Sequence, residues 1–405
     1  MRRGAACAMA LSLLVAAGCG SGDDELEPVI EPIRPAVEFD SIGELETELS
    51  LVAFAGYVED GSSDPEFDWV TEFQRKTGCA VRVRYVDTGG EVAALLGRRS
   101  GDYDGATVPG DAAGELILGR RVAAVDPTLF PAWNQILAPL RGDNATHYTA
   151  DGYVYGVPAL YGPNLLLYDT EIVDPAPSSW DVVFEPETPY AGRIAMIDSP
   201  MSIAQAALYL AAHEPQLDIE DPYALTPEQL DAATELLADQ EERVGQYWRL
   251  LTDSIDAFRD RDVVVGAAWP IALSLLELDD HPIEAAEPAE GLTGWADTWM
   301  MAADAPHPNC MLRWMSWTLT AEVQADLAFW YGGAPVNPDA CDLIRDQLGR
   351  FADIVDGPRF GHCGDAEYLS SLALWRMPTV DCRDARGRQC TGLPVWRSRW
   401  SLIRD

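Results

Sequence analysis

Hydrophobic and polar residues follow one another in blocks that predict strands and helices in turn. The run LSLVAFAG at 49–56 is short, apolar and ends in glycine, as is typical of a buried strand. The next block, DPEFDWVTEFQRKTG at 64–78, has apolar residues at helical spacing and ends in glycine, which predicts a helix. The same alternation continues through AVRVRYV at 80–86 (strand), GGEVAALLGRR at 89–99 (helix) and YDGATV at 103–108 (strand).

The pattern begins again after residue 158. NLLLYDTEIV, RIAMID and VVVGAAW are apolar enough for strands, and SIAQAALYLAAH at 202–213 predicts a helix between the last two. Strands that alternate with helices imply parallel sheets, with ligands at the carboxyl ends of the strands. We therefore expect an α/β protein of two lobes, each a mostly parallel sheet flanked by helices.

Two segments are candidates for crossing between the lobes. VYGVPALYGPN at 154–164 leads from the first half into the second, and GWADTWMMAADA at 294–305 follows the second half. If the latter is extended, Trp295, Asp297 and Trp299 share one face. A carboxylate buried among aromatic rings is costly unless a cation or a hydrogen-bond donor meets it. We expect Trp295 and Asp297 to be functional, and Trp299 to belong to the core.

The first residues predict export. Arg2 and Arg3 precede an apolar run that is short for a membrane span, and small residues lead to Cys19. Residues 1–18 are therefore expected to be a signal peptide, and Cys19 the lipid anchor of a periplasmic or cell-surface lipoprotein. The segment 19–48 is rich in acids, glycine and proline, which predicts a flexible tether. Beyond it we expect lobe 1 at 49–157 and 294–335, and lobe 2 at 158–293 and 336–405.

Composition and charge exclude several kinds of partner. The chain is 48% hydrophobic and carries a net charge of −38. Such acidity argues against nucleic acid and against anionic lipid, so contact with a membrane is expected only through the lipid anchor. We find no nucleophile elbow, zinc-protease motif or phosphate loop, which favours a binding protein over a secreted enzyme. No cofactor is predicted, and we expect a monomer.

Six cysteines remain after Cys7 and Cys19 are set aside, and an even number in an exported chain indicates disulfides. Cys382 and Cys390 enclose a short polar loop, so we expect them to pair. For the six together, the sequence alone allows 15 pairings. A metal site is the competing interpretation, but the spacings are not those of zinc ligands and the five histidines are scattered.

The ordered set of segments resembles the periplasmic binding proteins of ABC importers, in the spermidine/putrescine-binding group. The segments are the lipoprotein processing site that ends at Cys19, LVAFAGYV, YDGATVP, YGVPALYGPN, SSWDVVFEP, AGRIAMID, GAAWP, GWADTWMMAADAPHP and YGGAPVNP. The resemblance implies two lobes that close on a small amine and then dock on a permease. It also implies pairing of Cys79 with Cys310 and of Cys341 with Cys363.

The resemblance further implies an aromatic box around the ligand. In it Trp295 stacks on the ligand and Asp297 meets an ammonium group. Other positions that match, or replace, box residues of the group are Trp269, Tyr57, Phe54 and Tyr161.

One departure from the group changes the expected ligand. Ser199 and Ser202 stand where polyamine binders carry two acids, and Asp111 is a candidate replacement. A ligand with a single cationic end, such as an ω-amino acid like γ-aminobutyrate or a quaternary amine, is therefore the alternative to a polyamine. A secreted enzyme and an adhesion protein are weaker alternatives.

Overall fold

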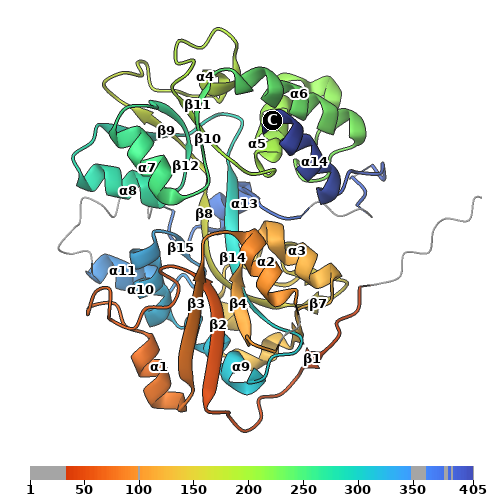
Figure 1. Ribbon diagram of the computed structural model, residues 1–405, viewed down its shortest axis with the longest axis vertical. Coiled ribbons are helices and arrows are strands. Elements are labelled where there is room, and N and C mark those ends of the chain that lie inside the picture. The colour runs from red at the N-terminus through yellow and green to blue at the C-terminus, as the bar shows by residue number, and fades with distance from the viewer. Residues whose placement is uncertain (1–32, 99–100, 348–361, 378–381, 385, 405) are drawn as a thin grey trace, which may run out of the picture. The chain divides into compact units, whose positions relative to one another are not determined.

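The fold is built around two β-sheets, which the chain visits in turn (Figure 1). The structure is a computed structural model, and it describes residues 33–98, 101–347, 362–377, 382–384 and 386–404. The expected signal peptide, Cys19 and most of the tether lie outside these residues. In the described part of the chain, no helix is both long and apolar enough to cross a membrane.

The larger sheet has seven strands in the order β15-β8-β14-β4-β2-β3, with β16 paired to β14. Strands β2, β3 and β4 run parallel, whereas β14 runs antiparallel to both β4 and β8. The bounds are β2 Glu48–Phe54, β3 Ala80–Val86, β4 Gly105–Val108, β8 Gly156–Pro163, β14 Thr293–Met301, β15 Ala334–Pro335 and β16 Ala373–Leu374. The associated helices are α1 Val70–Thr77, α2 Gly89–Leu96, α3 Gly110–Leu118, α9 Pro308–Thr318, α10 Ala321–Tyr331, α11 Ala340–Gln347 and α13 Ala366–Ser371.

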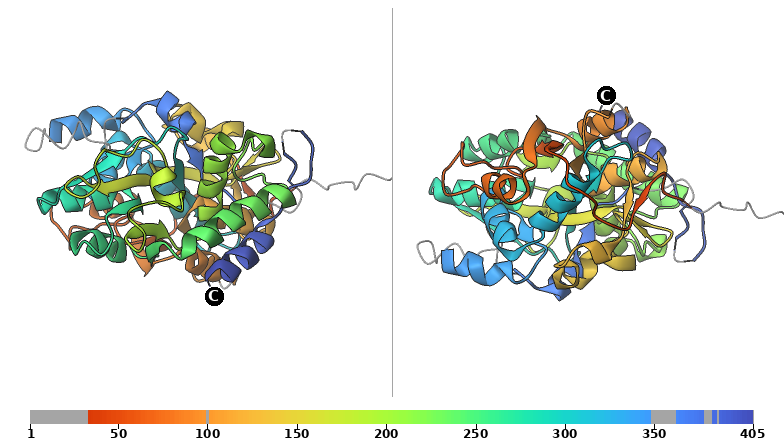
Figure 2. Two further views of the ribbon diagram at one scale, coloured as in Figure 1. Left: turned by 90° about the horizontal axis from the view of Figure 1, so that it is seen from above. Right: turned by 90° about the horizontal axis from the view of Figure 1, so that it is seen from below.

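The smaller sheet has five strands in the order β11-β10-β12-β9-β13. Its strands are β9 Leu165–Asp169, β10 Ile194–Ile197, β11 Val244–Trp248, β12 Val265–Ala268 and β13 Ile283–Ala286. Its helices are α4 Asp181–Phe184, α5 Ser202–His213, α6 Pro227–Glu241, α7 Leu251–Arg259, α8 Pro270–Leu278 and α14 Leu393–Arg404. Figure 2 shows the dark blue helix α14 beside the green helix α6, against which it packs.

Short elements complete the part that carries the larger sheet. Two small ribbons pair β1 Glu38–Phe39 with β5 Ala124–Val125, and β6 Thr149–Ala150 with β7 Tyr153–Val154. The 3₁₀ turn η3 Ala138–Leu140 packs against α13.

Both sheets are more mixed than the mostly parallel sheets that the sequence analysis expected. In the smaller sheet, β9 runs antiparallel to β12 and β13. The physical reason is that the chain crosses from the larger sheet to the smaller one and later returns. It runs from β8 directly into β9 and returns from β13 into β14, so each sheet receives strands of both directions (Figure 1).

The C-terminal part differs from the expected lobe boundaries. The sequence analysis placed residues 336–405 with the second lobe, but α11 packs against α10 and α13 packs against η3. Among the described C-terminal helices, α11 and α13 therefore lie with the larger sheet, and α14 lies with the smaller one. The expected pairs Cys79–Cys310, Cys341–Cys363 and Cys382–Cys390 are all present in the structure.

A third segment connects the two parts after the crossings at β8–β9 and β13–β14. The Ala373 amide donates to the Leu292 carbonyl at 3.0 Å, and the Trp375 amide donates to the Gly294 carbonyl at 2.7 Å. On the other side, the Tyr223 hydroxyl donates to the Ala373 carbonyl at 3.1 Å. We call residues 372–377 the strap, since they join α13 to the chain that leads to α14.

Candidate functional site

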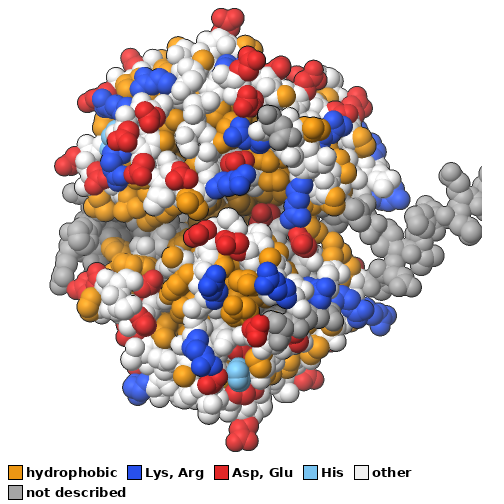
Figure 3. All heavy atoms as spheres, viewed as in Figure 1, with side chains coloured by type: hydrophobic (Ala, Val, Ile, Leu, Met, Phe, Trp, Pro, Cys, Tyr) orange, Lys and Arg blue, Asp and Glu red, His pale blue; other side chains and the backbone are white. Residues whose placement is uncertain are grey.

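The candidate site lies at the edge of the larger sheet where β2 and β4 end. Because these two strands are parallel, their carboxyl ends, at Phe54 and Val108, lie at the same edge. Strand β14 runs antiparallel to β4 with Thr298 opposite Val108, so Asp297 reaches the same edge. Figure 3 shows hydrophobic side chains in a band across the viewed face, between the part with the larger sheet and the part with the smaller one.

Trp295, Asp297 and Trp299 share one face of β14, as the alternation predicts. The pairing of β14 with β8 has a register shift, but the extra residue is on β8, so β14 keeps its alternation. Trp299 is fully buried and meets the ring of Trp314 edge-on, with ring centroids 5.6 Å apart. Its expected place in the core is confirmed.

Asp297 is buried and accepts a hydrogen bond from a tyrosine. The residue is 4% exposed, and the Tyr57 hydroxyl donates to Oδ2 at 2.5 Å. Burial is the largest effect on this carboxyl and raises its pKa to about 7. The hydrogen bond from Tyr57 opposes that rise, and the negative charge of Asp111 adds to it.

Aromatic rings form the wall around this carboxylate. The Tyr57 ring lies 4.4 Å from the ring of Tyr331, the last residue of α10, and 6.3 Å from that of Phe54, measured between centroids. Tyr331 also meets Trp295 edge-on at 6.1 Å. Phe54, Tyr57 and Trp295 are therefore brought together as expected, with Tyr331 as a further member.

Trp295 fits between two glycines. A Cβ at Gly162 would lie 2.7 Å from the Trp295 ring, and a Cβ at Gly333 would lie 2.8 Å from it. Any side chain at either position would displace the indole, so the glycines permit its close approach to the backbone. The indole Nε1 is buried without a hydrogen-bond partner among the described residues. The pair Gly332–Gly333, directly after Tyr331, is the sequence signal by which that tyrosine could have been found.

Asp111 lies at the start of α3, directly after β4. Its Oδ1 is buried and has no hydrogen-bond partner among the described residues. Burial is the main cause that raises its pKa. In the described chain, neither Asp111 nor Asp297 has a lysine or arginine within ion-pair distance. The edge thus holds two carboxylates without an ion-pair partner among the described residues, although the positive charge of Arg397 acts on Asp111 from beyond ion-pair distance. This electrostatic setting favours a positively charged ligand.

Trp269 lies on the other part of the molecule, immediately before α8. It is half-buried, meets Trp248 edge-on at 4.8 Å, and has no described partner for its Nε1. A Cβ at Gly332 would come within 2.8 Å of the side chain of Ile271, so the start of α8 touches the residue that follows Tyr331. Trp269 therefore lies on the segment of the smaller-sheet part that approaches the aromatic wall.

Three expected residues do not join this group. Tyr161 pairs with Ala296, so it points to the face of the sheet opposite Asp297. Ser202 donates its hydroxyl to the Ile197 carbonyl at 2.7 Å, and the Ser199 hydroxyl accepts from the Met201 amide at 3.2 Å. Both hydroxyls thus hydrogen-bond the backbone at the start of α5.

Comparison with known proteins places this chain in a family. The model of the bacterial extracellular solute-binding protein family matches residues 68–347. A putrescine/agmatine-binding protein of Pseudomonas aeruginosa is 27% identical over 297 residues, which are 68% of this chain and 76% of that protein.

Two solved structures share the fold. The first is a spermidine/putrescine ABC transporter substrate-binding protein, PotD, of Streptococcus pneumoniae, with a TM-score of 0.66, 15% identity, and coverage of 89% of this chain and 98% of that one. The second is a GABA receptor, Atu4243, with a TM-score of 0.61, 18% identity, and coverage of 81% and 91%. The two-lobed α/β fold expected from the sequence is that of substrate-binding proteins. The chain belongs to the bacterial extracellular solute-binding protein family.

Proposed function

We propose that this protein captures a small amine, of the polyamine class, and delivers it to the permease of an ABC importer. The observation that carries the proposal is the buried carboxylate of Asp297, which lies on a crossing strand among Tyr57, Tyr331 and Trp295 without a cationic partner. The Pseudomonas relative, a putrescine/agmatine-binding protein, supports the same class of ligand. The protein acts in this scheme as a monomeric carrier, without catalysis.

Each group has a role in holding an ammonium ion. Asp297 accepts a charge-assisted hydrogen bond from the ammonium, while the ring of Trp295 attracts it and covers the methylene chain. Asp111 supplies a second carboxylate for the other cationic end. Phe54 and Trp269 extend the aromatic wall, and Tyr161, Ser199 and Ser202 are given no direct contact.

Two carboxylates favour a polyamine over the alternative ligands. An ω-amino acid also needs a cation or amide donors for its own carboxylate. Two arginines that could pair with such a carboxylate, Arg193 and Arg249, are engaged elsewhere. Arg193 donates to the Arg261 carbonyl at 3.0 Å, and Arg249 pairs with Asp198 at 2.9 Å. A quaternary amine has no N–H to donate to Asp297.

Titration calorimetry with putrescine, agmatine, spermidine, γ-aminobutyrate, choline and a sugar tests the proposal. We expect the diamines and polyamines to bind and the sugar not to bind. Tight binding of γ-aminobutyrate or choline alone would contradict the polyamine class, and tight binding of the sugar alone would contradict the amine site.

The affinity for the amine should also depend on pH. The pKa of Asp297 is raised to about 7, so its carboxyl becomes protonated as the pH falls below 7 and cannot then pair with an ammonium. Aliphatic amines stay protonated throughout this range. We expect about tenfold weaker binding at pH 6 than at pH 8, because the ionised fraction of such a group changes by that factor.

We also propose that Cys19 carries a lipid that holds the exported protein at a membrane surface. Replacement by serine removes the thiol that would be lipidated, so Cys19→Ser should move the protein from the membrane fraction to the soluble fraction, or stop its processing. Fractionation of cells followed by immunoblotting measures this. Membrane association equal to that of the unchanged protein would contradict the lipid anchor.

A further inference from the structure

Three side chains of metal-binding types converge on the part that carries the smaller sheet. Asp181 is the first residue of α4, His213 is the last residue of α5, and Glu290 lies in the turn between β13 and β14. One ligand atom from each lies within 4.8 Å of the other two. The three residues are far apart in the sequence, so only the fold brings them together.

The distances in this group suit a small metal ion. His213 Nε2 lies 2.8 Å from Glu290 Oε1 and 3.7 Å from Asp181 Oδ1. Zinc binds nitrogen and oxygen ligands at about 2.0–2.2 Å, which places neighbouring ligand atoms of a tetrahedral site about 3.3 Å apart. The two measured distances lie on either side of that value, so side-chain movements of a few tenths of an ångström would give these two pairs the required spacing.

Hydrogen bonds from neighbouring residues orient the carboxylate of Glu290. The Ser179 hydroxyl donates to Oε1 at 2.5 Å, and the Trp180 amide donates to Oε2 at 3.3 Å. The side chain is only 2% exposed. The carboxylate is therefore held in one orientation, with Oε1 facing His213.

A tyrosine fixes the other two ligands. The Tyr209 hydroxyl donates to Asp181 Oδ1 at 2.8 Å, and the Tyr209 ring stacks on the imidazole of His213 with centroids 4.1 Å apart. Support of this kind, from residues that do not bind the ion themselves, tunes and orients metal ligands. A cavity of about 350 Å³, lined in part by Tyr209 and His213, adjoins the group and leaves room for water as a further ligand.

We propose that Asp181, His213 and Glu290 bind one zinc ion. The imidazole nitrogen favours zinc over calcium and magnesium, which prefer oxygen ligands. In the unfolded chain the three ligands are not together, so the ion binds the folded state and stabilises it. The ion would join α4, α5 and the turn before β14 at one point. This site is separate from the amine site and does not depend on the proposed function.

Zinc titration of the tag-free protein at pH 7.5, by calorimetry and by thermal unfolding, tests the proposal. We expect one zinc per chain and a higher unfolding temperature with zinc. His213→Gln and Glu290→Gln should each weaken zinc binding by about tenfold or more, since changes even to supporting residues of metal sites cost 10- to 100-fold. Cobalt(II) in place of zinc should give a visible absorption band in the unchanged protein, which needs no variant.

His362→Gln is the matched control. His362 also stacks on a tyrosine, Tyr368, at 3.7 Å, and its Nδ1 lies 3.8 Å from Asp365, but the structure groups no second carboxylate with this pair among the described residues. Its zinc affinity should equal that of the unchanged protein. Zinc binding that survives His213→Gln, or no zinc binding by the unchanged protein, would overturn the proposal. Putrescine binding by His213→Gln should stay unchanged, so a failure here is distinct from failure of the amine site.

Discussion

Asp297→Asn should weaken amine binding by about 30-fold to several thousand-fold, which corresponds to a loss of about 2–5 kcal/mol. The substitution keeps the size of the side chain and its hydrogen bond with Tyr57, but removes the charge that meets the ammonium. Calorimetry with the best ligand of the amine panel measures the change. An affinity within about threefold of the unchanged protein would show that Asp297 has a structural role.

The stability of Asp297→Asn should rise, whereas its affinity for the amine should fall. The folded pKa of Asp297 is about 7, above the value of about 3.9 expected for the unfolded chain. The ionised carboxylate therefore costs stability above pH 7, and this cost disappears as the pH falls below the unfolded value. Without ligand, Asp297→Asn should raise the free energy of unfolding at pH 8, by up to about 4 kcal/mol. A variant that is more stable but binds poorly cannot owe its weak binding to unfolding.

Two further variants separate charge from packing and from general damage to the sheet. Trp295→Ala should weaken every amine ligand, whereas Asp297→Asn should weaken cationic ligands far more than neutral ones. Asp104→Asn is the matched control, because Asp104 is a fully buried acid of the same sheet region that pairs with His307 at 3.0 Å and lies before β4, away from the site. It should lower stability and leave amine affinity unchanged.

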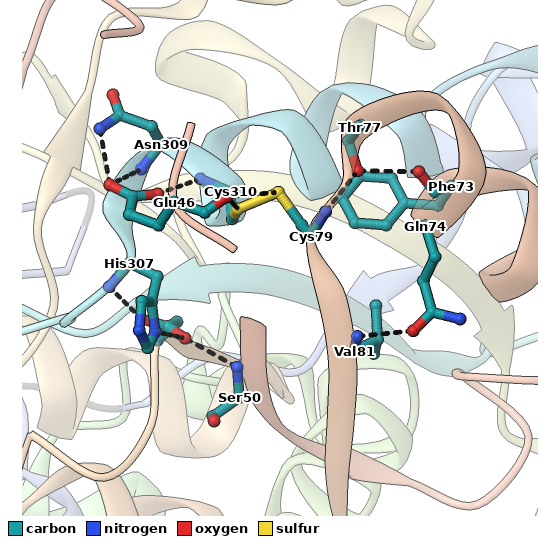
Figure 4. Close-up of a disulfide and its surroundings, with 11 residues drawn as sticks. Glu46, Ser50, Phe73, Gln74, Thr77, Cys79, Val81, His307, Asn309 and Cys310 are labelled. Atoms are coloured by element: carbon teal, nitrogen blue, oxygen red, sulfur yellow. Dashed lines mark hydrogen bonds and ion pairs between the residues drawn. A yellow bond between two sulfur atoms is a disulfide. The ribbon is translucent and has the colours of Figure 1, made fainter. Parts of the chain in front are cut away.

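Removal of the Cys79–Cys310 disulfide should cost about 5 kcal/mol of stability. The bond links residues 231 positions apart, from the start of β3 to the first turn of α9 (Figure 4). In the chain-entropy model, the stabilisation grows with the logarithm of the loop that the bond closes. Chemical denaturation of Cys79→Ala/Cys310→Ala against the unchanged protein measures the loss.

The C-terminal disulfide provides the comparison. Cys382–Cys390 spans a separation of only 8 residues, so the double replacement Cys382→Ala/Cys390→Ala should cost about 2.5 kcal/mol. Both variants delete the same atoms, so their difference reports the loop length and the local packing. Equal losses in the two variants would contradict the loop-entropy account. In both variants the start of α9 keeps its contact with Glu46, which accepts from the residue 310 amide at 2.9 Å in the unchanged protein (Figure 4).

Local patterns predicted those elements whose burial follows a simple period. Helix α5 and strand β3 begin and end where the sequence pattern placed them, because α5 is a mostly apolar run and β3 has valine or tyrosine at alternate positions from Val81 to Tyr85. The shared face of Trp295 and Asp297 also follows from the period of a strand. Sheet direction did not follow, because the pattern of β14 is the same for parallel and antiparallel pairing.

Contacts between segments that are distant in the sequence could not be predicted from local patterns. Tyr57 and Asp297 are separated by 240 positions, and nothing in either neighbourhood indicates that one donates to the other. The same holds for Asp181, His213 and Glu290, which lie together only in the fold. The sequence analysis set a metal site aside because the cysteine spacings are not those of zinc ligands and the histidines are scattered. For Ser199 and Ser202 a family position suggested ligand contact, and the structure adds that both hydroxyls hydrogen-bond the backbone at the start of α5.

The strap limits how the two parts can move. Two adjacent strands could act as a swivel and allow twisting as well as bending, but a third attachment beside them, through the hydrogen bonds of Ala373 and Trp375 to the backbone around β14, resists torsion. We therefore expect the joint to bend about a single axis. A single degree of freedom leaves a smaller set of open arrangements to be lost on closure, so less of the ligand's binding free energy is needed to offset that loss of entropy.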